Sequence, residues 1–235
     1  MAKTKKSIVF CHGIWADGSC FSKVIPALQA EGHDVVAAQY GLDTHAGDVA
    51  AVKRTLGRVS SPAILVGHSY GGAVITSAGT DDRVVGLVYV AAVAPDADET
   101  VTGQLGKFPT TDVFKHIAPA DGRVWMLPDG VQFFAGDLPE HEQKVVWATH
   151  YPPAADLFDQ KMEGTAWKSK PSWYLLTTED RMIPPAAQRA MSGRAGSTVV
   201  EVRASHSVYV SQPQAVVDLI AQAAKVAHQV VGAAV

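Results

Sequence analysis

Short apolar runs alternate with segments of helical periodicity over most of the chain. Runs bounded by glycine or polar residues are typical of strands buried on both faces of a parallel sheet. The runs that predict strands are Ile8–Cys11, Val35–Ala38, Ala63–Val66, Val84–Ala92, Trp173–Thr177 and Thr198–Val202. Apolar residues that recur every three or four positions predict helices between them, at 21–28, 49–56, 71–78, 186–191 and 214–227.

The alternation breaks between residues 95 and 166, a stretch rich in aromatic side chains. Within it, Glu140–His150 has a helical pattern. Two β-prone runs, Val124–Leu127 and Val131–Phe134, flank the turn-forming residues Pro128-Asp129-Gly130. These runs predict a hairpin with its turn at those three residues.

Alternating strands and helices predict an α/β fold, a mostly parallel sheet of about six strands with helices on both faces. Residues 1–94 and 167–235 would form this core, and residues 95–166 would form a helical and hairpin insertion that caps it. Active sites in such sheets lie at the carboxyl ends of the strands. The candidate residues described below all follow a predicted strand.

Composition narrows the class of protein. The chain has 235 residues, 47% hydrophobic and 18% charged, which fits one folded domain. The net charge of −3 argues against a nucleic-acid surface. No apolar stretch is long enough to cross a membrane and no secretory signal is visible, so we expect a cytoplasmic protein. Cys11 and Cys20 are expected to be buried thiols.

The motif with the clearest chemistry is Gly67-His68-Ser69-Tyr70-Gly71. It matches G-x-S-x-G, follows the strand at 63–66 directly and opens a helix, the context in which this motif raises a nucleophilic serine on a sharp turn. The alternative is a glycine-rich turn whose serine only caps the helix. Neither glycine-rich turn supplies the lysine of a phosphate-binding loop and no G-x-G-x-x-G is present, so we expect no cofactor and no metal.

A serine hydroxyl needs a general base, and His206 is the candidate because it directly follows the last predicted strand. His12 and His68 are expected to frame the catalytic loops. The histidines expected at the surface are His33, His45 and His228.

The base in turn needs a carboxylate, for which Asp180 is favoured because it follows the strand at 173–177. The order Ser, Asp, His along the chain is the usual one for this arrangement. Glu179, Asp96 and Asp98 are the competing carboxylates.

Negative charge that develops on a carbonyl oxygen needs backbone N–H donors. One donor should be the N–H of Tyr70, the residue after the serine. The other should come from the loop after the first strand, with Ile14 favoured and Trp15 next.

With these residues in place, the chain resembles the α/β-hydrolase superfamily over nearly its whole length. It is most similar to small bacterial hydrolases that resemble plant salicylate-ester esterases and hydroxynitrile lyases. The resemblance rests on His12-Gly13, Gly67–Gly72, Glu179-Asp180-Arg181 with Ile183-Pro184, and Ser205-His206. It implies that Ser69, Asp180 and His206 form the triad. The lyases carry a lysine directly after the catalytic histidine, whereas this chain has Ser207, which argues against a lyase.

These residues predict a serine carboxylesterase that acts on small hydrophobic esters through an acyl-enzyme. The alternatives on the same triad are a C–C lyase, a thioesterase or a perhydrolase, and more remotely a ligand-binding receptor without catalysis. Candidate substrate-contacting residues are Trp15, Trp125, Phe133 and Trp147, although the last three could equally pack the insertion onto the sheet. The expected partner is a small-molecule ester. The oligomeric state stays open, with a homodimer among the options.

Overall fold

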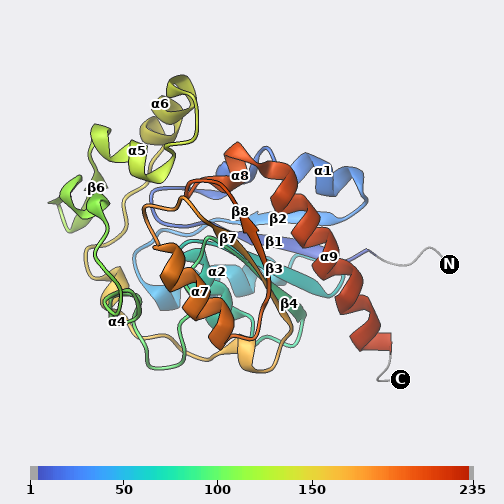
Figure 1. The fold of residues 1–235 in the computed structure, drawn as a ribbon. Helices are drawn as coiled ribbons and strands as arrows, with labels where there is room; N and C mark the ends of the chain where they lie inside the picture. Colours follow the sequence, from blue (N-terminus) through green and yellow to red (C-terminus); the bar gives the residue numbers. More distant parts are fainter. Residues whose placement is uncertain (1–4, 233–235) are drawn as a thin grey trace.

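The computed structural model describes residues 5–232, with side chains described up to residue 226. Six parallel strands form one sheet in the order β2-β1-β3-β4-β7-β8 (Figure 1). Their bounds are β1 Ser7–Cys11, β2 Asp34–Ala38, β3 Ala63–His68, β4 Val84–Val90, β7 Ser172–Thr177 and β8 Thr198–Val202. The predicted parallel sheet and its six strands are therefore confirmed.

The inner strands form because their residues are apolar on both faces. Every residue of β1, β3 and β7 is buried, whereas the edge strand β8 is mostly exposed. Glu201 on β8 pairs with Arg189 in the solvent. A charged, short edge strand of this kind discourages pairing with a second sheet.

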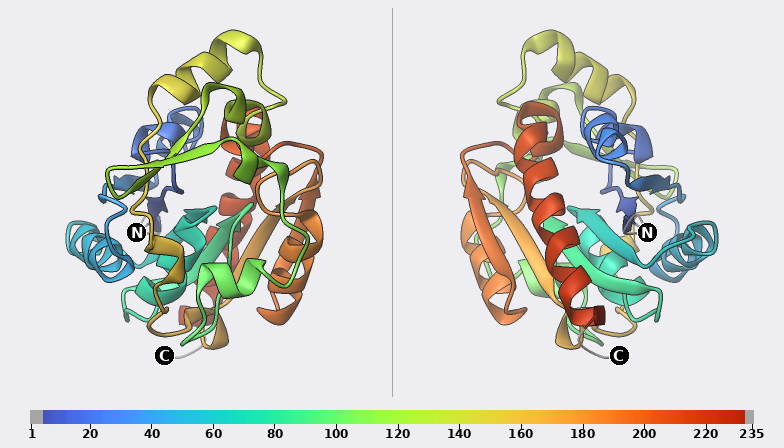
Figure 2. Two further views of the ribbon diagram at one scale, coloured as in Figure 1. Left: turned by 90° about the vertical axis from the view of Figure 1, so that its left-hand side faces the viewer. Right: turned by 90° about the vertical axis from the view of Figure 1, so that its right-hand side faces the viewer.

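Helices cover both faces of the sheet (Figure 2). One face packs on α1 (Ile25–Ala30), α8 (Val208–Ser211) and α9 (Pro213–Gly232), with the 3₁₀ turn η1 (Gly18–Phe21) before α1. The other face packs on α2 (His45–Leu56), α3 (Gly71–Ala78) and α7 (Pro185–Arg194). Side chains alternate along β1, so Ile8 and Phe10 join the first cluster while Val9 and Cys11 join the second.

Most of the segment between β4 and β7 lies beyond the carboxyl ends of the strands, on the left of Figure 1, and its last part returns along α3 to the start of β7. Its elements are α4 Val101–Leu105, η2 Asp112–Lys115, β5 Ile117–Ala120, β6 Arg123–Met126, η3 Pro128–Gly130, α5 Val131–Phe134, α6 Glu140–Ala148, η4 Leu157–Asp159 and η5 Ala166–Lys168. Its buried side chains, among them Val113, Phe134 and Leu157, belong to the same apolar cluster as α2, α3 and α7.

The predicted hairpin is wrong in its turn and in its second strand. Val131–Phe134 is helical, and β6 pairs antiparallel with the preceding strand β5. The turn is at Asp121-Gly122, where both residues have positive φ, 51° and 73°. A tight hairpin turn requires this conformation, which Asp-Gly adopts readily. Gly130 has a φ of −71° and instead leads from the 3₁₀ turn into α5.

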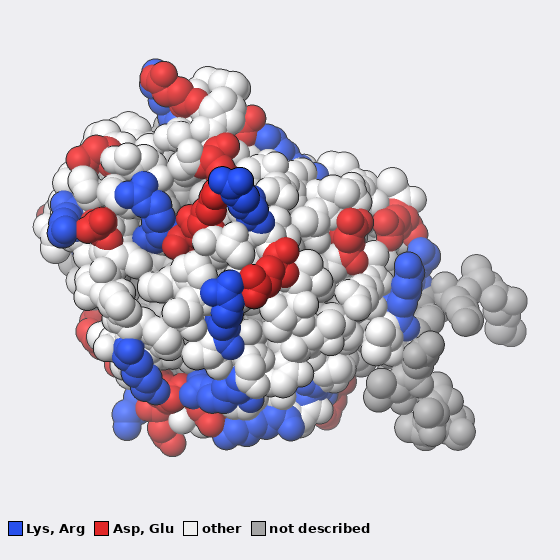
Figure 3. All heavy atoms as spheres, viewed as in Figure 1, with Lys and Arg blue, Asp and Glu red and all other residues white. Residues whose placement is uncertain are grey.

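Charged side chains of both signs are interspersed over the face drawn in Figure 3. Among the described residues, no helix is long and apolar enough to span a membrane. Cys11 is buried as expected, but Cys20 is partly exposed.

Candidate active site

Ser69 lies on a sharp turn between β3 and α3. Its φ is +55°, in the left-handed region that non-glycine residues rarely adopt. The turn is held by its backbone: the Ser69 N–H donates to the Val90 carbonyl at 3.2 Å, and the Ser69 carbonyl accepts from Gly72 and Val93. The strained conformation is therefore imposed by β3, β4 and α3 together, as the elbow motif predicts.

Two glycines allow the elbow to sit against its neighbours. A Cβ atom on Gly67 would lie 2.5 Å from the Gly71 carbonyl oxygen. A Cβ on Gly13 would lie 2.7 Å from the Cβ of Ser69, so the loop after β1 approaches the serine as closely as a backbone can.

His206 follows β8 and is fully buried. Its Nδ1 lies 2.8 Å from Oδ2 of Asp180, which is itself buried. Because an ionised carboxylate only accepts hydrogen bonds, Nδ1 carries the proton and Nε2 keeps a free lone pair. Nε2 makes no hydrogen bond to any described residue. The ring is thus oriented with its basic nitrogen unoccupied.

The His206 loop lies against the elbow. His68, next to Ser69, donates from Nε2 to the His206 carbonyl at 3.0 Å, and the two imidazole rings lie 4.6 Å apart. Burial and the neighbouring His206 lower the pKa of His68 well below its usual range, so His68 is neutral. His68 therefore joins the elbow to the His206 loop, although His68 and His206 are 138 positions apart in sequence.

Asp180 is fixed by five hydrogen bonds. Its Oδ1 accepts the N–H groups of Met182 and Ile183 at 2.8 and 2.9 Å. Its Oδ2 accepts from the Thr177 hydroxyl and the Gln188 amide, both at 2.9 Å, in addition to His206. Buried Gln188 was not identified from the sequence, because a polar residue on a helix face gives no signal of a partner on another element.

The competing carboxylates lie elsewhere. Glu179 pairs with exposed Arg203 at 2.6 Å. Asp96 pairs with Lys168 and accepts from Thr165, which lowers the pKa of Asp96 to about 2. Asp98 forms no hydrogen bond or ion pair with His206. Only Asp180 of the four contacts the His206 ring.

The two backbone donors expected to stabilise an oxyanion are free. Among the described residues, the N–H groups of Ile14 and Tyr70 donate to no other group. The N–H of Trp15, the second choice in this loop, donates to the Tyr151 carbonyl at 3.0 Å. The geometry thus favours Ile14 over Trp15.

The insertion holds the His206 loop on both sides. Asp137 accepts from the N–H of Ser205 at 3.0 Å and also contacts its hydroxyl. Ser207 donates from its N–H and its hydroxyl to the carbonyl of Phe134. The Phe134 ring lies edge-on to the His206 ring, with centroids 5.1 Å apart.

A small apolar cavity of about 40 Å³ opens onto Ser69. Its lining contains no charged side chain and consists of Ile14, Trp15, Ser69, Tyr70, Val93, Val101, Leu105, Val113, Phe114, Phe158, Met182 and Ile183. Two further cavities of about 220 Å³ adjoin it, and both share Phe114 and Phe158 with it.

Of the four aromatic residues expected to contact substrate, only Trp15 lines the Ser69 cavity. Trp125 and Trp147 are more than a third exposed and pack on His150. Phe133 is buried beneath the Arg181 guanidinium, which lies 4.1 Å from the ring centroid. These three residues do not line the Ser69 cavity, and their contact with substrate stays a prediction.

A buried polar cluster lies behind the elbow. The Tyr70 hydroxyl donates to Asp48 at 2.9 Å, and His45 contacts both the Tyr70 hydroxyl and Ser77. Burial raises the pKa of Asp48 to about 6 and lowers that of His45 to about 4. The surface location expected for His45 is therefore wrong.

His33 and His228 were also expected at the surface. His33 is buried, with Nδ1 bonded to the Lys6 carbonyl, so the expected surface location is wrong. The side chain of His228 lies outside the described residues.

The chain belongs to the alpha/beta hydrolase family, whose model matches residues 8–219. It is 30% identical to a pyrethroid hydrolase of Sphingobium wenxiniae over 93% of this chain and 87% of that protein. Methylesterase 8 of Arabidopsis thaliana is 32% identical over 46% of this chain and 45% of its own length. A crystal structure of a pyrethroid hydrolase from Sphingobium faniae superposes with a TM-score of 0.80 at 26% identity, covering 94% of this chain and 97% of that one.

The family and these relatives identify the chain as an enzyme of the ester-hydrolase type. The predicted resemblance to plant esterases is confirmed. The relatives are named as hydrolases and esterases, which does not favour a lyase, a thioesterase or a perhydrolase.

Proposed function

We propose that the protein is a serine carboxylesterase in which Ser69 is the nucleophile, His206 the general base and Asp180 the residue that orients His206. The observation that carries this assignment is the buried His206 ring, with Nδ1 held by Asp180 and Nε2 unoccupied beside the elbow. A base in this state can accept a serine proton without first losing another partner.

In the first half-reaction, His206 Nε2 takes the Ser69 hydroxyl proton as Oγ attacks the ester carbonyl carbon. The carbonyl oxygen becomes negative and accepts the N–H groups of Ile14 and Tyr70, each worth about 3 kcal/mol in comparable sites. The protonated His206 then donates its proton to the alcohol oxygen as the C–O bond breaks. The alcohol leaves, and the acyl group remains on Ser69.

In the second half-reaction, water replaces the alcohol. His206 Nε2 takes a proton from water as its oxygen attacks the acyl carbonyl, and the same two N–H groups hold the oxyanion. When the bond to Oγ breaks, His206 returns the proton to Ser69 and the carboxylic acid is released. Asp180 stabilises the imidazolium form in both halves.

The substrate we propose is a small, uncharged, hydrophobic ester. The uncharged lining of the Ser69 cavity supports this choice, because burying a charged group there would leave the charge unpaired. The adjoining cavities behind Phe114 and Phe158 offer room for apolar groups on either side of the ester. We also infer that residues 95–166 act as the cap, since they supply Phe114 and Phe158. A cytoplasmic location and a homodimer stay predictions from the sequence.

The test is hydrolysis of p-nitrophenyl butyrate by the wild type and by Ser69→Ala. We expect Ser69→Ala to lose at least a thousandfold in kcat/KM, because the nucleophile is gone. The exposed variant Ser60→Ala is the matched control and should retain wild-type activity. Equal turnover by Ser69→Ala and Ser60→Ala, with both variants folded by circular dichroism, would contradict the proposal.

A further inference from the structure

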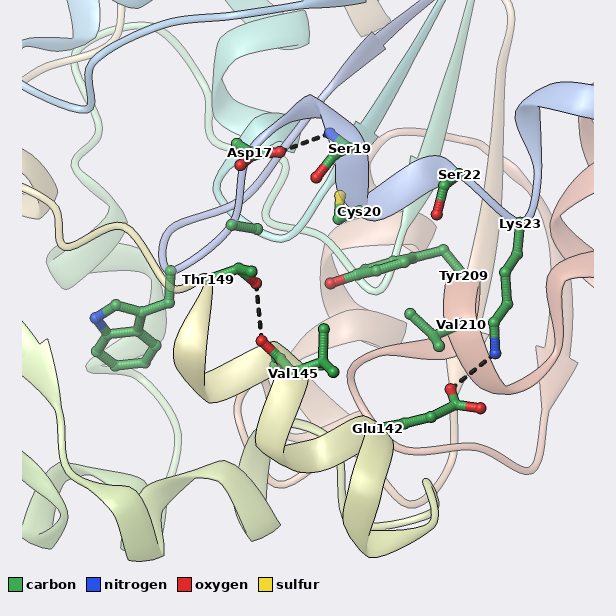
Figure 4. Close-up of a pocket in the computed structure, with 13 residues that line it drawn as sticks. Asp17, Ser19, Cys20, Ser22, Lys23, Glu142, Val145, Thr149, Tyr209 and Val210 are labelled. Carbon is green, nitrogen blue, oxygen red and sulfur yellow. Dashed lines mark hydrogen bonds and ion pairs between the residues drawn. The ribbon is translucent and has the colours of Figure 1, made fainter.

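One cavity that borders the loops around the candidate site does not contain Ser69. It is a cleft of about 360 Å³ between η1, α6 and the start of α8 (Figure 4). Its lining residues are Trp15, Ala16, Asp17, Ser19, Cys20, Ser22, Lys23, Glu142, Val145, Val146, Thr149, Tyr209 and Val210. The volume is in the range of pockets that hold small organic molecules.

One wall of the cleft is a helix face that the chain itself leaves uncovered. No residue of α6 is buried, and Val145 is 60% exposed. Glu142, Val145, Val146 and Thr149 repeat at three- and four-residue intervals, so they share the face that lines the cleft. The Lys23–Glu142 ion pair, 2.7 Å long, joins this face to the segment after η1 (Figure 4).

The opposite walls combine apolar surface with uncharged polar groups. Trp15, Ala16 and Val210 contribute apolar atoms. Tyr209 forms a wall of the cleft and is only 2% exposed, and Figure 4 shows its hydroxyl toward the space between η1 and α6. Ser19 and Ser22 add hydroxyl groups from the η1 side. Such a lining suits a flat apolar molecule that carries a hydrogen-bonding group.

The charges around the cleft select against an anion. Its one cationic side chain, Lys23, is already paired with Glu142. Asp17 adds a second carboxylate, one oxygen of which caps the N–H of Ser19 at 2.6 Å. The Lys23–Glu142 pair is neutral as a unit, so a carboxylate ligand would meet the unpaired negative charge of Asp17 and no free positive group.

We propose that this cleft is a second small-molecule site, which binds a neutral aromatic alcohol. The aromatic ring packs against Val145, Val146 and Val210, and its hydroxyl group bonds to Tyr209. The site is separate from the Ser69 cavity, and its existence does not depend on the esterase mechanism.

Two residues connect the cleft to the Ser69 site through direct contacts. Trp15 lines both the cleft and the Ser69 cavity. The Tyr209 ring packs edge-on against His68 at 4.6 Å, and His68 in turn bonds the His206 carbonyl.

The test measures binding rather than turnover. The probes are 2-naphthol and 2-naphthoate at pH 7.5, titrated by calorimetry into the Ser69→Ala variant. We expect 2-naphthol to bind with one-to-one stoichiometry and 2-naphthoate to bind at least tenfold more weakly. Failure of the esterase proposal would leave this result unchanged, because Ser69 takes no part in it.

Three variants locate the probe. Val145→Trp fills the cleft from an exposed position and should weaken 2-naphthol binding at least tenfold. Lys144→Trp places the same side chain on the same helix but outside the cleft lining, and should bind like the parent. Leu105→Trp fills the Ser69 cavity and should also bind like the parent. Circular dichroism checks that each variant is folded.

Other outcomes overturn the proposal. Absence of 2-naphthol binding removes the site. Equal binding of the two probes contradicts the charge argument that defines the ligand class. Loss of binding in Leu105→Trp with retention in Val145→Trp places the probe in the Ser69 cavity instead.

Discussion

Gln188 shows how one buried side chain can support the proposed site without touching the substrate. Its amide donates to Asp180 Oδ2, and its carbonyl oxygen accepts the N–H of Thr177 at 3.1 Å. It therefore ties β7, α7 and the Asp180 carboxylate together. A residue that orients a catalytic group in this way affects the reaction rate, because every turnover depends on the position of that group.

We expect Gln188→Met, which keeps the shape but removes every side-chain hydrogen bond of this residue, to lower kcat/KM about tenfold. It should also cost about 2 kcal/mol of unfolding free energy, since the Thr177 N–H is left unpaired. Ester hydrolysis and urea denaturation measure the two effects. Gln222→Met, at an exposed position on α9, is the control and should match the wild type in both. Unchanged kcat/KM in Gln188→Met would remove its positioning role.

Asp48 makes stability depend on pH in an unusual direction. Burial raises its pKa to about 6 in the folded protein, while the unfolded chain titrates near the ordinary value of about 3.9. Between these values the folded state binds more protons, so this group's contribution to stability falls as pH rises from about 4 to about 6.

The side chain in Asp48→Asn cannot ionise, so this variant does not lose stability as the pH rises from about 4 to about 6. Relative to the wild type, its unfolding free energy should improve by about 2 kcal/mol between pH 4.5 and pH 7.5. Urea denaturation at the two pH values measures the difference. Asp82→Asn, which removes an exposed carboxylate, should track the wild type at both. A constant difference between Asp48→Asn and the wild type would show that Asp48 does not titrate in this range.

A candidate site residue can be predicted from the sequence when a local motif or its position after a strand marks it. Ser69 is recognisable from its glycines, and His206 and Asp180 from their places after strands. Gln188 and Asp48 have no such pattern, because their partners come from other elements. His45 was misplaced for the same reason: its partners Tyr70 and Ser77 lie on and before α3, not on α2.

Among the elements, α5 and the loop that follows it matter most for the His206 loop. The Phe134 carbonyl binds Ser207, and Asp137 binds Ser205, so both neighbours of His206 are anchored to the insertion. Such anchoring limits the positions that the imidazole can adopt relative to Ser69. If His206 is the base proposed above, the insertion affects the chemical step through the position of this residue.

We expect Asp137→Asn to weaken this anchor and lower kcat about fivefold with little change in KM, because substrate contacts are untouched. Steady-state hydrolysis of p-nitrophenyl butyrate separates the two constants. Glu163→Gln, which neutralises another exposed carboxylate of the insertion, should leave both constants unchanged. A rise in KM at constant kcat would instead assign Asp137 to substrate binding.

Elements of the sheet were predictable because their pattern is strong. Continuous apolar runs such as β3 and β7 admit few alternatives when every residue is buried. In the insertion the runs are short, and two turn signals lie close together, Asp121-Gly122 and Pro128-Asp129-Gly130. Only the first adopts positive φ at both residues, and nothing in the local sequence ranks it above the second.

The whole molecule is built on two apolar clusters, one on each face of the sheet. The insertion has no separate core: Val113, Phe134 and Leu157 belong to the cluster that includes α2, α3 and α7. A segment that shares its buried surface with the main body is not expected to fold or unfold alone.

We therefore expect a single thermal transition. Far-ultraviolet circular dichroism reports mainly on the helices around the sheet, and tryptophan fluorescence includes Trp125 and Trp147 of the insertion. Both signals should give the same midpoint. Fluorescence that changes well before the circular dichroism would show that the insertion melts independently.

The left-handed backbone conformation of Ser69 lowers the stability of the folded protein at the residue on which its proposed activity depends. Glycine is the residue that this conformation prefers, and replacing serine would relieve about 1 kcal/mol of steric cost. A selection for heat tolerance alone would thus favour Ser69→Gly, which removes the proposed nucleophile. Directed evolution of this enzyme for thermal stability should therefore screen for activity in every round. Otherwise the selected variants will be stable but inactive.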